Sequence, residues 1–136
     1  VACVLTPDAL EYPNQLIPAA RVGARSFPGA AYALAAVFYR ASEYDEAIRC
    51  FDEVANVYRF RADNWFFLAM AQHRLGRSVE ARRSLAEGIA WIDTADRQDE
   101  DDLSGTRPAW GAWHERVTFP LLRREAEALV RESNAN

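Results

Sequence analysis

The sequence predicts an all-α fold built as a stack of antiparallel helical hairpins. Three observations carry this prediction. Shifting the chain by 34 residues aligns similar residues, which is the mark of an internal repeat. Apolar residues recur every three or four positions inside each segment, as on one face of a helix. Residues that cap or end helices stand at the joints between these segments.

The repeat contains two full units of two helices each. The aligned pairs are Leu34-Ala35 with Leu68-Ala69, Tyr39-Arg40 with His73-Arg74, Ser42 with Gly76, Glu46-Ala47 with Glu80-Ala81, and Phe51 with Leu85. Helices are expected over 30–41 and 44–58 in the first unit, and over 64–75 and 78–93 in the second. Asp63 is placed to cap the third of these helices, and Gly76 to end it in the left-handed conformation.

The whole chain of 136 residues fits one domain. We predict a partial repeat over 1–27, repeats over 28–61 and 62–95, an acidic loop over 96–109 and a capping helix over 110–136. The partial repeat starts a helix at Pro13, which Pro18 should bend. A terminal helix with one polar face would close the open end of the stack.

The period and residue types resemble the tetratricopeptide repeat. That family places an aromatic residue, then Leu and a small residue, in the first helix, and Trp65, Leu68 and Ala69 match this pattern. It also places Gly at the turn, as Gly76 does, and a small residue where the helices touch. Ala47 and Ala81 occupy those last positions, whereas Ala31 and Ser42 depart from the pattern in the first unit, and neither unit ends in the usual Pro.

Two strings are similar to the repeat tails of large bacterial multidomain proteins that also carry a serine/threonine kinase or WD-repeat region. They are 64–76 (NWFFLAMAQHRLG) and 121–129 (LLRREAEAL). The resemblance implies a scaffold that binds other proteins and is not an enzyme. With two cysteines, Cys3 and Cys50, in apolar surroundings and no disulfide framework, a cytoplasmic location is expected.

No pattern in the sequence indicates catalysis, a metal site or a cofactor. His73 and His114 lack a second ligand at metal-binding spacing, the glycines are scattered, and no serine or cysteine stands near an activating base. The acidic run 93–102 does not have the spacing of a calcium loop, so a solvated loop is expected there.

Charge and hydropathy exclude two classes of partner. The formal net charge is −4, and the segment 96–102, with five acids and one base, accounts for all of it. The remainder is neutral overall and offers no broad basic surface for nucleic acid. The longest apolar runs are too short to span a membrane.

The candidate binding site is the concave groove that the first helices of successive repeats line in the resembling family. By that registration the groove residues are Tyr32, Tyr39, Arg40, Phe66, Met70, His73 and Arg74, with Ala36 between the first two. Aromatic rings and Met offer apolar area, and the two arginines suit carboxylates. The expected partner is a protein or peptide with acidic and hydrophobic residues.

Two alternatives remain open at this point. The capping helix or a neighbouring domain could cover the groove residues, and Trp110 and Trp113 could either seal the stack or contact a partner. The chain could also serve as a structural spacer or self-association element of a larger bacterial signalling protein.

Overall fold

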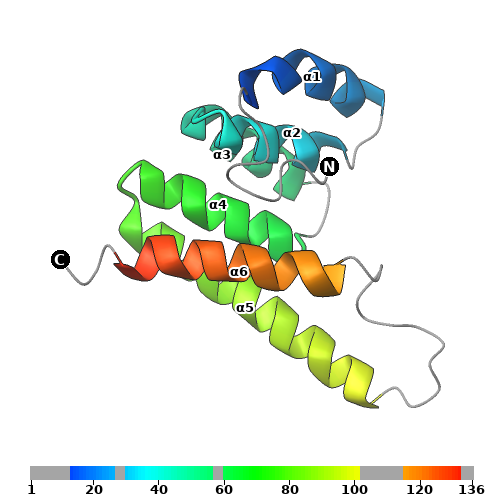
Figure 1. Ribbon diagram of the computed structural model, residues 1–136, viewed down its shortest axis with the longest axis vertical. Coiled ribbons are helices and arrows are strands. Elements are labelled where there is room, and N and C mark those ends of the chain that lie inside the picture. Colours follow the sequence, from blue (N-terminus) through cyan, green and yellow to red (C-terminus); the bar gives the residue numbers. More distant parts are fainter. Residues whose placement is uncertain (1–12, 27–29, 57–59, 102–114, 133–136) are drawn as a thin grey trace.

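The computed structural model describes residues 13–26, 30–56, 60–101 and 115–132, and in these ranges every regular element is a helix (Figure 1). The elements, in chain order, are a short 3-10 helix η2 (Pro13–Leu16), α1 (Ile17–Ser26), α2 (Ala30–Arg40), α3 (Tyr44–Ala55), α4 (Ala62–Arg74), α5 (Ser78–Asp101) and α6 (Glu115–Glu132). The all-α prediction is therefore confirmed for the described residues. None of their helices is both long and apolar enough to cross a membrane.

The helices pair as the repeat predicts. The pairs α2/α3 and α4/α5 form two hairpins, and α4 also packs against α2 and α3 of the preceding hairpin. Helix α1 packs on α2 at one end of the stack, while α6 packs on α4 and α5 at the other (Figure 1). Helix α4 thus lies at the centre, with α2, α3, α5 and α6 around it.

The turns inside the two hairpins have the same geometry, 34 residues apart. Ser42 has a φ of 62° and Gly76 a φ of 78°, so each turn contains one left-handed residue. In both turns the amide of this residue donates to the carbonyl three positions earlier at 3.0 Å. The next amide in both turns donates to the carbonyl five positions earlier at 2.9 Å. The repeat therefore extends to backbone hydrogen bonding, and the prediction for Gly76 is confirmed.

Small residues allow the paired helices to approach closely. Ala47 and Ala81, predicted as contact positions, are both completely buried. A further small residue, Gly88 of α5, lies against the ring of Phe66 of α4. A Cβ atom added at Gly88 would be 2.6 Å from that ring, so the close approach of α4 and α5 requires glycine here.

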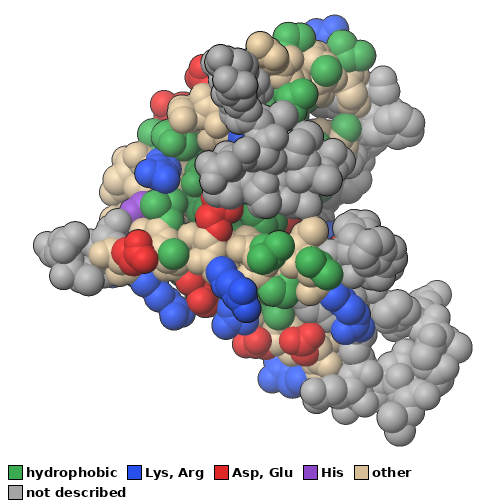
Figure 2. Space-filling model, in the orientation of Figure 1, with side chains coloured by type: hydrophobic (Ala, Val, Ile, Leu, Met, Phe, Trp, Pro, Cys, Tyr) green, Lys and Arg blue, Asp and Glu red, His purple; other side chains and the backbone are tan. Residues whose placement is uncertain are grey.

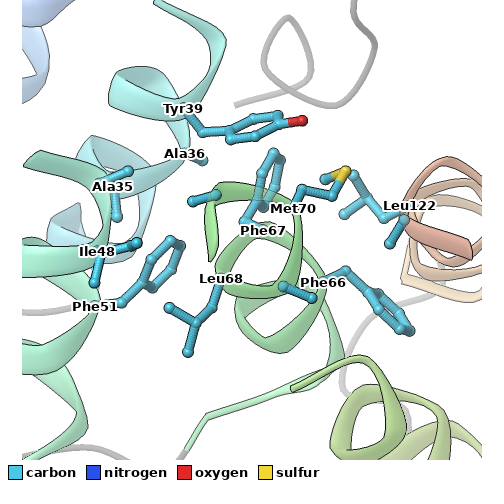
Figure 3. Close-up of a cluster of buried hydrophobic side chains, with 14 of the residues drawn as sticks. Ala35, Ala36, Tyr39, Ile48, Phe51, Phe66, Phe67, Leu68, Met70 and Leu122 are labelled. Atoms are coloured by element: carbon cyan, nitrogen blue, oxygen red, sulfur yellow. The ribbon is translucent and has the colours of Figure 1, made fainter. Parts of the chain in front are cut away.

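The core is centred on α4 (Figure 3). Six consecutive residues, 66–71, are each at most 6% exposed, so α4 buries every side of its middle turns. A helix that is apolar all round must be covered on every side. The α2–α3 hairpin, α5 and α6 together supply that cover.

Two predictions about helix ends are wrong. The acidic segment does not begin a loop at 96, because α5 continues to Asp101. Ile92 and Ala95 are buried on this helix, and no Gly or Pro interrupts it before its end, so the helix propagates into the acidic residues. Asp63 is not the cap of α4 but lies within its first turn. The amide of Arg61 donates instead to the side-chain oxygen of Asn64 at 2.8 Å, which closes the start of the helix.

The two equivalent turns give opposite expectations for substitution. A left-handed conformation costs an L-residue about 1–2 kcal/mol, part of which glycine gives back through its greater freedom in the unfolded chain. Ser42→Gly should therefore raise the free energy of unfolding by up to about 1 kcal/mol, and Gly76→Ala should lower it by about 1 kcal/mol. Urea denaturation measures both. Equal effects of the same sign would contradict the shared turn geometry.

Candidate protein-binding face

The candidate site is the surface that α6 covers. Helix α6 lies beside α4 and across α5 (Figure 1), and one side chain of α2 reaches it from the far side of α4. We call this surface the α6 seat and define it by four residues, Arg40 of α2, Arg61 at the start of α4, Met70 of α4 and Trp91 of α5. All four contact or face the buried side of α6.

The buried side of α6 is an apolar stripe. Its residues are Phe119, Leu122, Ala126 and Val130, and each is at most 4% exposed. Met70 and Leu122 point toward one another between α4 and α6 (Figure 3), and both are fully buried. The rings of Trp91 and Phe119 meet edge to face with centroids 5.6 Å apart. Packing of this density is typical of a helix held in an apolar groove.

Arg40 binds α6 at the middle of that helix. Its two terminal nitrogens donate to the two carboxylate oxygens of Glu125, one of them at 2.9 Å. The guanidinium also lies over the rings of Tyr39 and Phe67, 5.5 and 5.3 Å from their centroids. Only 6% of the Arg40 side chain is exposed, so this is a bidentate, aromatic-backed and largely desolvated pair.

Arg61 binds α6 at its first residue in the same manner. It donates to Glu115, which is only 6% exposed, and its guanidinium lies 5.5 Å from the ring centroids of both Trp91 and Phe119. The seat therefore offers two aromatic-backed arginines, each paired with one glutamate of α6. The two glutamates are ten residues apart, which corresponds to roughly 15 Å along a helix.

A second carboxylate lies near the Arg61–Glu115 pair. Asp63 is in the first turn of α4, and its Oδ1 is enclosed with no hydrogen bond among the described residues. Burial raises the pKa of Asp63 and the charge of Glu115 raises it further, although the amide of Asn64 and the charge of Arg61 oppose the rise. One arginine thus serves two carboxylates here, which makes this end of the seat electrostatically costly.

The predicted groove residues take several different environments. Tyr39, Phe66 and Met70 are buried, and Arg40 is paired within the chain. Tyr32 is half-buried with its ring edge-on to Phe60, at 5.9 Å between centroids, and His73 is also half-buried. Arg74 alone among the seven is exposed. The capping helix therefore covers the floor of the predicted groove, one of the two alternatives left open by the sequence.

Arg40 and Arg74 lie on the same side of the stack, as the repeat predicts. The hydroxyl of Tyr39 shares a hydrogen bond with Arg74, which raises the pKa of the Arg74 guanidinium. Burial raises the pKa of Tyr39, against the lowering effect of that hydrogen bond. Glu125 acts electrostatically on both Tyr39 and Arg74, so the end of α4 and the middle of α6 share one charged cluster.

Three residues of this site were missed in the sequence, namely Arg61, Glu115 and Glu125. One signal was present for Glu115, which stands four residues before Phe119 and so continues the apolar stripe of α6. An acid in phase with a buried stripe needs a cation in the facing surface. No comparable signal pointed to Glu125, which lies at the edge of the stripe.

The remaining candidates for chemistry give no site. Cys50 is buried and burial raises the pKa of its thiol, so it stays protonated, as predicted for an inert cysteine. Across the described ranges no three His, Cys, Asp or Glu residues gather in a way that could hold a metal ion. Cys3, Trp110, Trp113 and His114 lie outside the described residues.

Comparisons with known proteins add no family. No family model, no curated protein and no solved structure matches this chain. The interpretation of the site therefore depends on its geometry.

The raised pKa of Asp63 predicts a pH-dependent stability. Because the folded state holds the proton more tightly than the unfolded state, this carboxyl group favours folding below its ordinary pKa of 3.8. Its contribution is lost as the pH rises from that value through the folded pKa. Asp63→Asn, which cannot ionise, should therefore gain stability relative to the parent as the pH rises. Urea denaturation of both proteins between acidic and neutral pH measures the difference, and a difference independent of pH would contradict the prediction.

Proposed function

We propose that this chain is a non-catalytic helical-repeat module for protein–protein interaction, of the tetratricopeptide-like kind, whose concave face holds a helical segment. One observation carries the proposal. The face formed by α4 and α5, with Arg40 of α2, holds an amphipathic helix, α6, through an apolar floor and two arginine–glutamate pairs. Grooves that bind helices use this combination of apolar anchors and flanking charges.

The equivalent turns and buried alanines 34 residues apart support the tetratricopeptide-like part of the proposal. A bacterial multidomain signalling protein as the parent, and a cytoplasmic location, also belong to the proposal and rest on the sequence resemblance and the cysteine content. Protein or peptide segments with acidic and hydrophobic residues are the proposed partners. Nucleic acid, membranes, metals and cofactors have no part in the proposal.

The proposal predicts where a partner acts on this chain. A partner isolated with the chain and then purified should bind it saturably, and hydrogen–deuterium exchange should change in α2, α4 or α6. As a control, Arg49→Glu should leave the dissociation constant unchanged, because Arg49 lies on α3, is 61% exposed and pairs only locally with Glu46. Exchange that changes only in α1 and α3, or the absence of any saturable partner, would contradict the proposal.

The alternative is a structural spacer or self-association element, and one observation favours it. Helix α6 leaves Val117 and Leu121, one turn apart, 57% and 45% exposed on its outer side. Figure 2 shows apolar side chains gathered over this part of α6, with arginines beside them. Two such faces could pair between copies of the chain.

Sedimentation velocity separates this alternative from the first. Self-association through α6 predicts a concentration-dependent dimer that becomes monomeric when Val117→Ser and Leu121→Ser are combined. A wild-type chain that stays monomeric at all concentrations tested would remove the self-association reading.

A further inference from the structure

Helix α6 identifies the chemistry that its seat selects. The seat presents an apolar floor between two guanidiniums, and α6 meets it with apolar residues at 119, 122, 126 and 130 and with carboxylates at 115 and 125. We propose that the α6 seat takes an amphipathic helix of a partner protein with this same pattern, in competition with α6. This inference rests on the proposed function and specifies its partner.

The seat keeps its recognition groups whatever helix occupies it. Tyr39 and Phe67 back Arg40, and Trp91 backs Arg61, and all three rings belong to the seat side of the interface. Because these rings hold the guanidiniums in place, the charged groups are preorganised for two carboxylates ten residues apart on a helix. A partner helix with one carboxylate, or with a wider spacing, would leave one arginine desolvated and unpaired.

Helix α6 carries features that make it displaceable, and they lie near its start. Pro120 has no amide hydrogen, so the second turn of α6 lacks one backbone hydrogen bond. Glu115 is buried beside Asp63, and the raised pKa of Asp63 reflects the cost of placing two carboxylates near one arginine. On the α5 side, α6 is held by a long, partly exposed contact of 3.8 Å between Arg123 and Asp93, a kind of pair that contributes little.

An internal competitor sets the apparent affinity of the seat. A partner can bind only the fraction of molecules in which α6 has left, so its apparent dissociation constant rises as α6 docks more tightly. A substitution in the seat weakens both α6 and the partner, and its net effect is small. A substitution confined to the buried side of α6 weakens the competitor alone and should strengthen partner binding.

The test uses the full chain and a fluorescent peptide with the sequence of residues 115–132 as the probe. Glu125→Ala in the chain removes the carboxylate that Arg40 binds but leaves the seat unchanged. We expect this chain to bind the peptide at least tenfold more tightly than the wild-type chain in fluorescence anisotropy. Arg124→Ala is the matched control, because Arg124 is the neighbouring residue and is exposed. It should bind the peptide as the wild type does.

A second variant and a second peptide complete the experiment. Leu122→Ala in the chain, which weakens α6 through its apolar stripe, should also strengthen binding, and circular dichroism checks that both variants stay helical. A peptide carrying Glu125→Ala should bind the Glu125→Ala chain at least tenfold more weakly than the parent peptide. Equal binding of both peptides would overturn the proposed recognition by Arg40.

The outcomes separate this inference from the proposed function. If folded variants bind a natural partner but not the peptide, the partner chemistry inferred here is wrong and the interaction module stands. If they bind neither, the proposed function fails as well. Dimers that exchange α6 between copies, detected by sedimentation of the wild-type chain, would identify a second copy as the occupant and overturn the inference.

Discussion

The constraint on which this structure depends is that α4 is apolar on every side. A helix in a simple two-layer stack can leave one side open to solvent, but residues 66–71 of α4 are all buried and include two phenylalanines and the only methionine of the chain. The α2–α3 hairpin and α5 cover the sides that the repeat arrangement would cover. The last side faces the concave surface, and α6 covers it. The position of α6 therefore follows from the composition of α4.

Covering an apolar helix does not by itself fix which residues of α6 face inward or where α6 stops along α4. The two arginine–glutamate pairs supply that specificity. Arg40 with Glu125 and Arg61 with Glu115 fix the register at two points, and the surrounding rings remove both guanidiniums from water. Pairs of this kind contribute more to a defined geometry than to net stability, because desolvation offsets much of their attraction.

Most of the fold could be predicted from the sequence because its signals are local. The 34-residue period, the left-handed Gly76 and the buried Ala47 and Ala81 all depend on residues within one hairpin, and all were confirmed. The end of α5 was predicted wrongly because acidic composition was taken to outweigh an uninterrupted helical pattern. The seat was missed in part because Arg40 and Glu125 are 85 residues apart, and no pattern within one helix indicates which distant acid an arginine will meet. The run of apolar residues 66–71 did contain the signal that the groove would be covered.

The central claim is that α6 lies on α4 with its apolar stripe against the concave side. Met70 is the only methionine, so labelling the methionine methyl group with carbon-13 gives a single resonance at the middle of the interface. The account predicts nuclear Overhauser contacts from this methyl group to Leu122, because the two side chains point toward one another and are both fully buried. A Met70 methyl group that shows contacts within α4 but none to α6, and that is accessible to a soluble paramagnetic probe, would contradict the account.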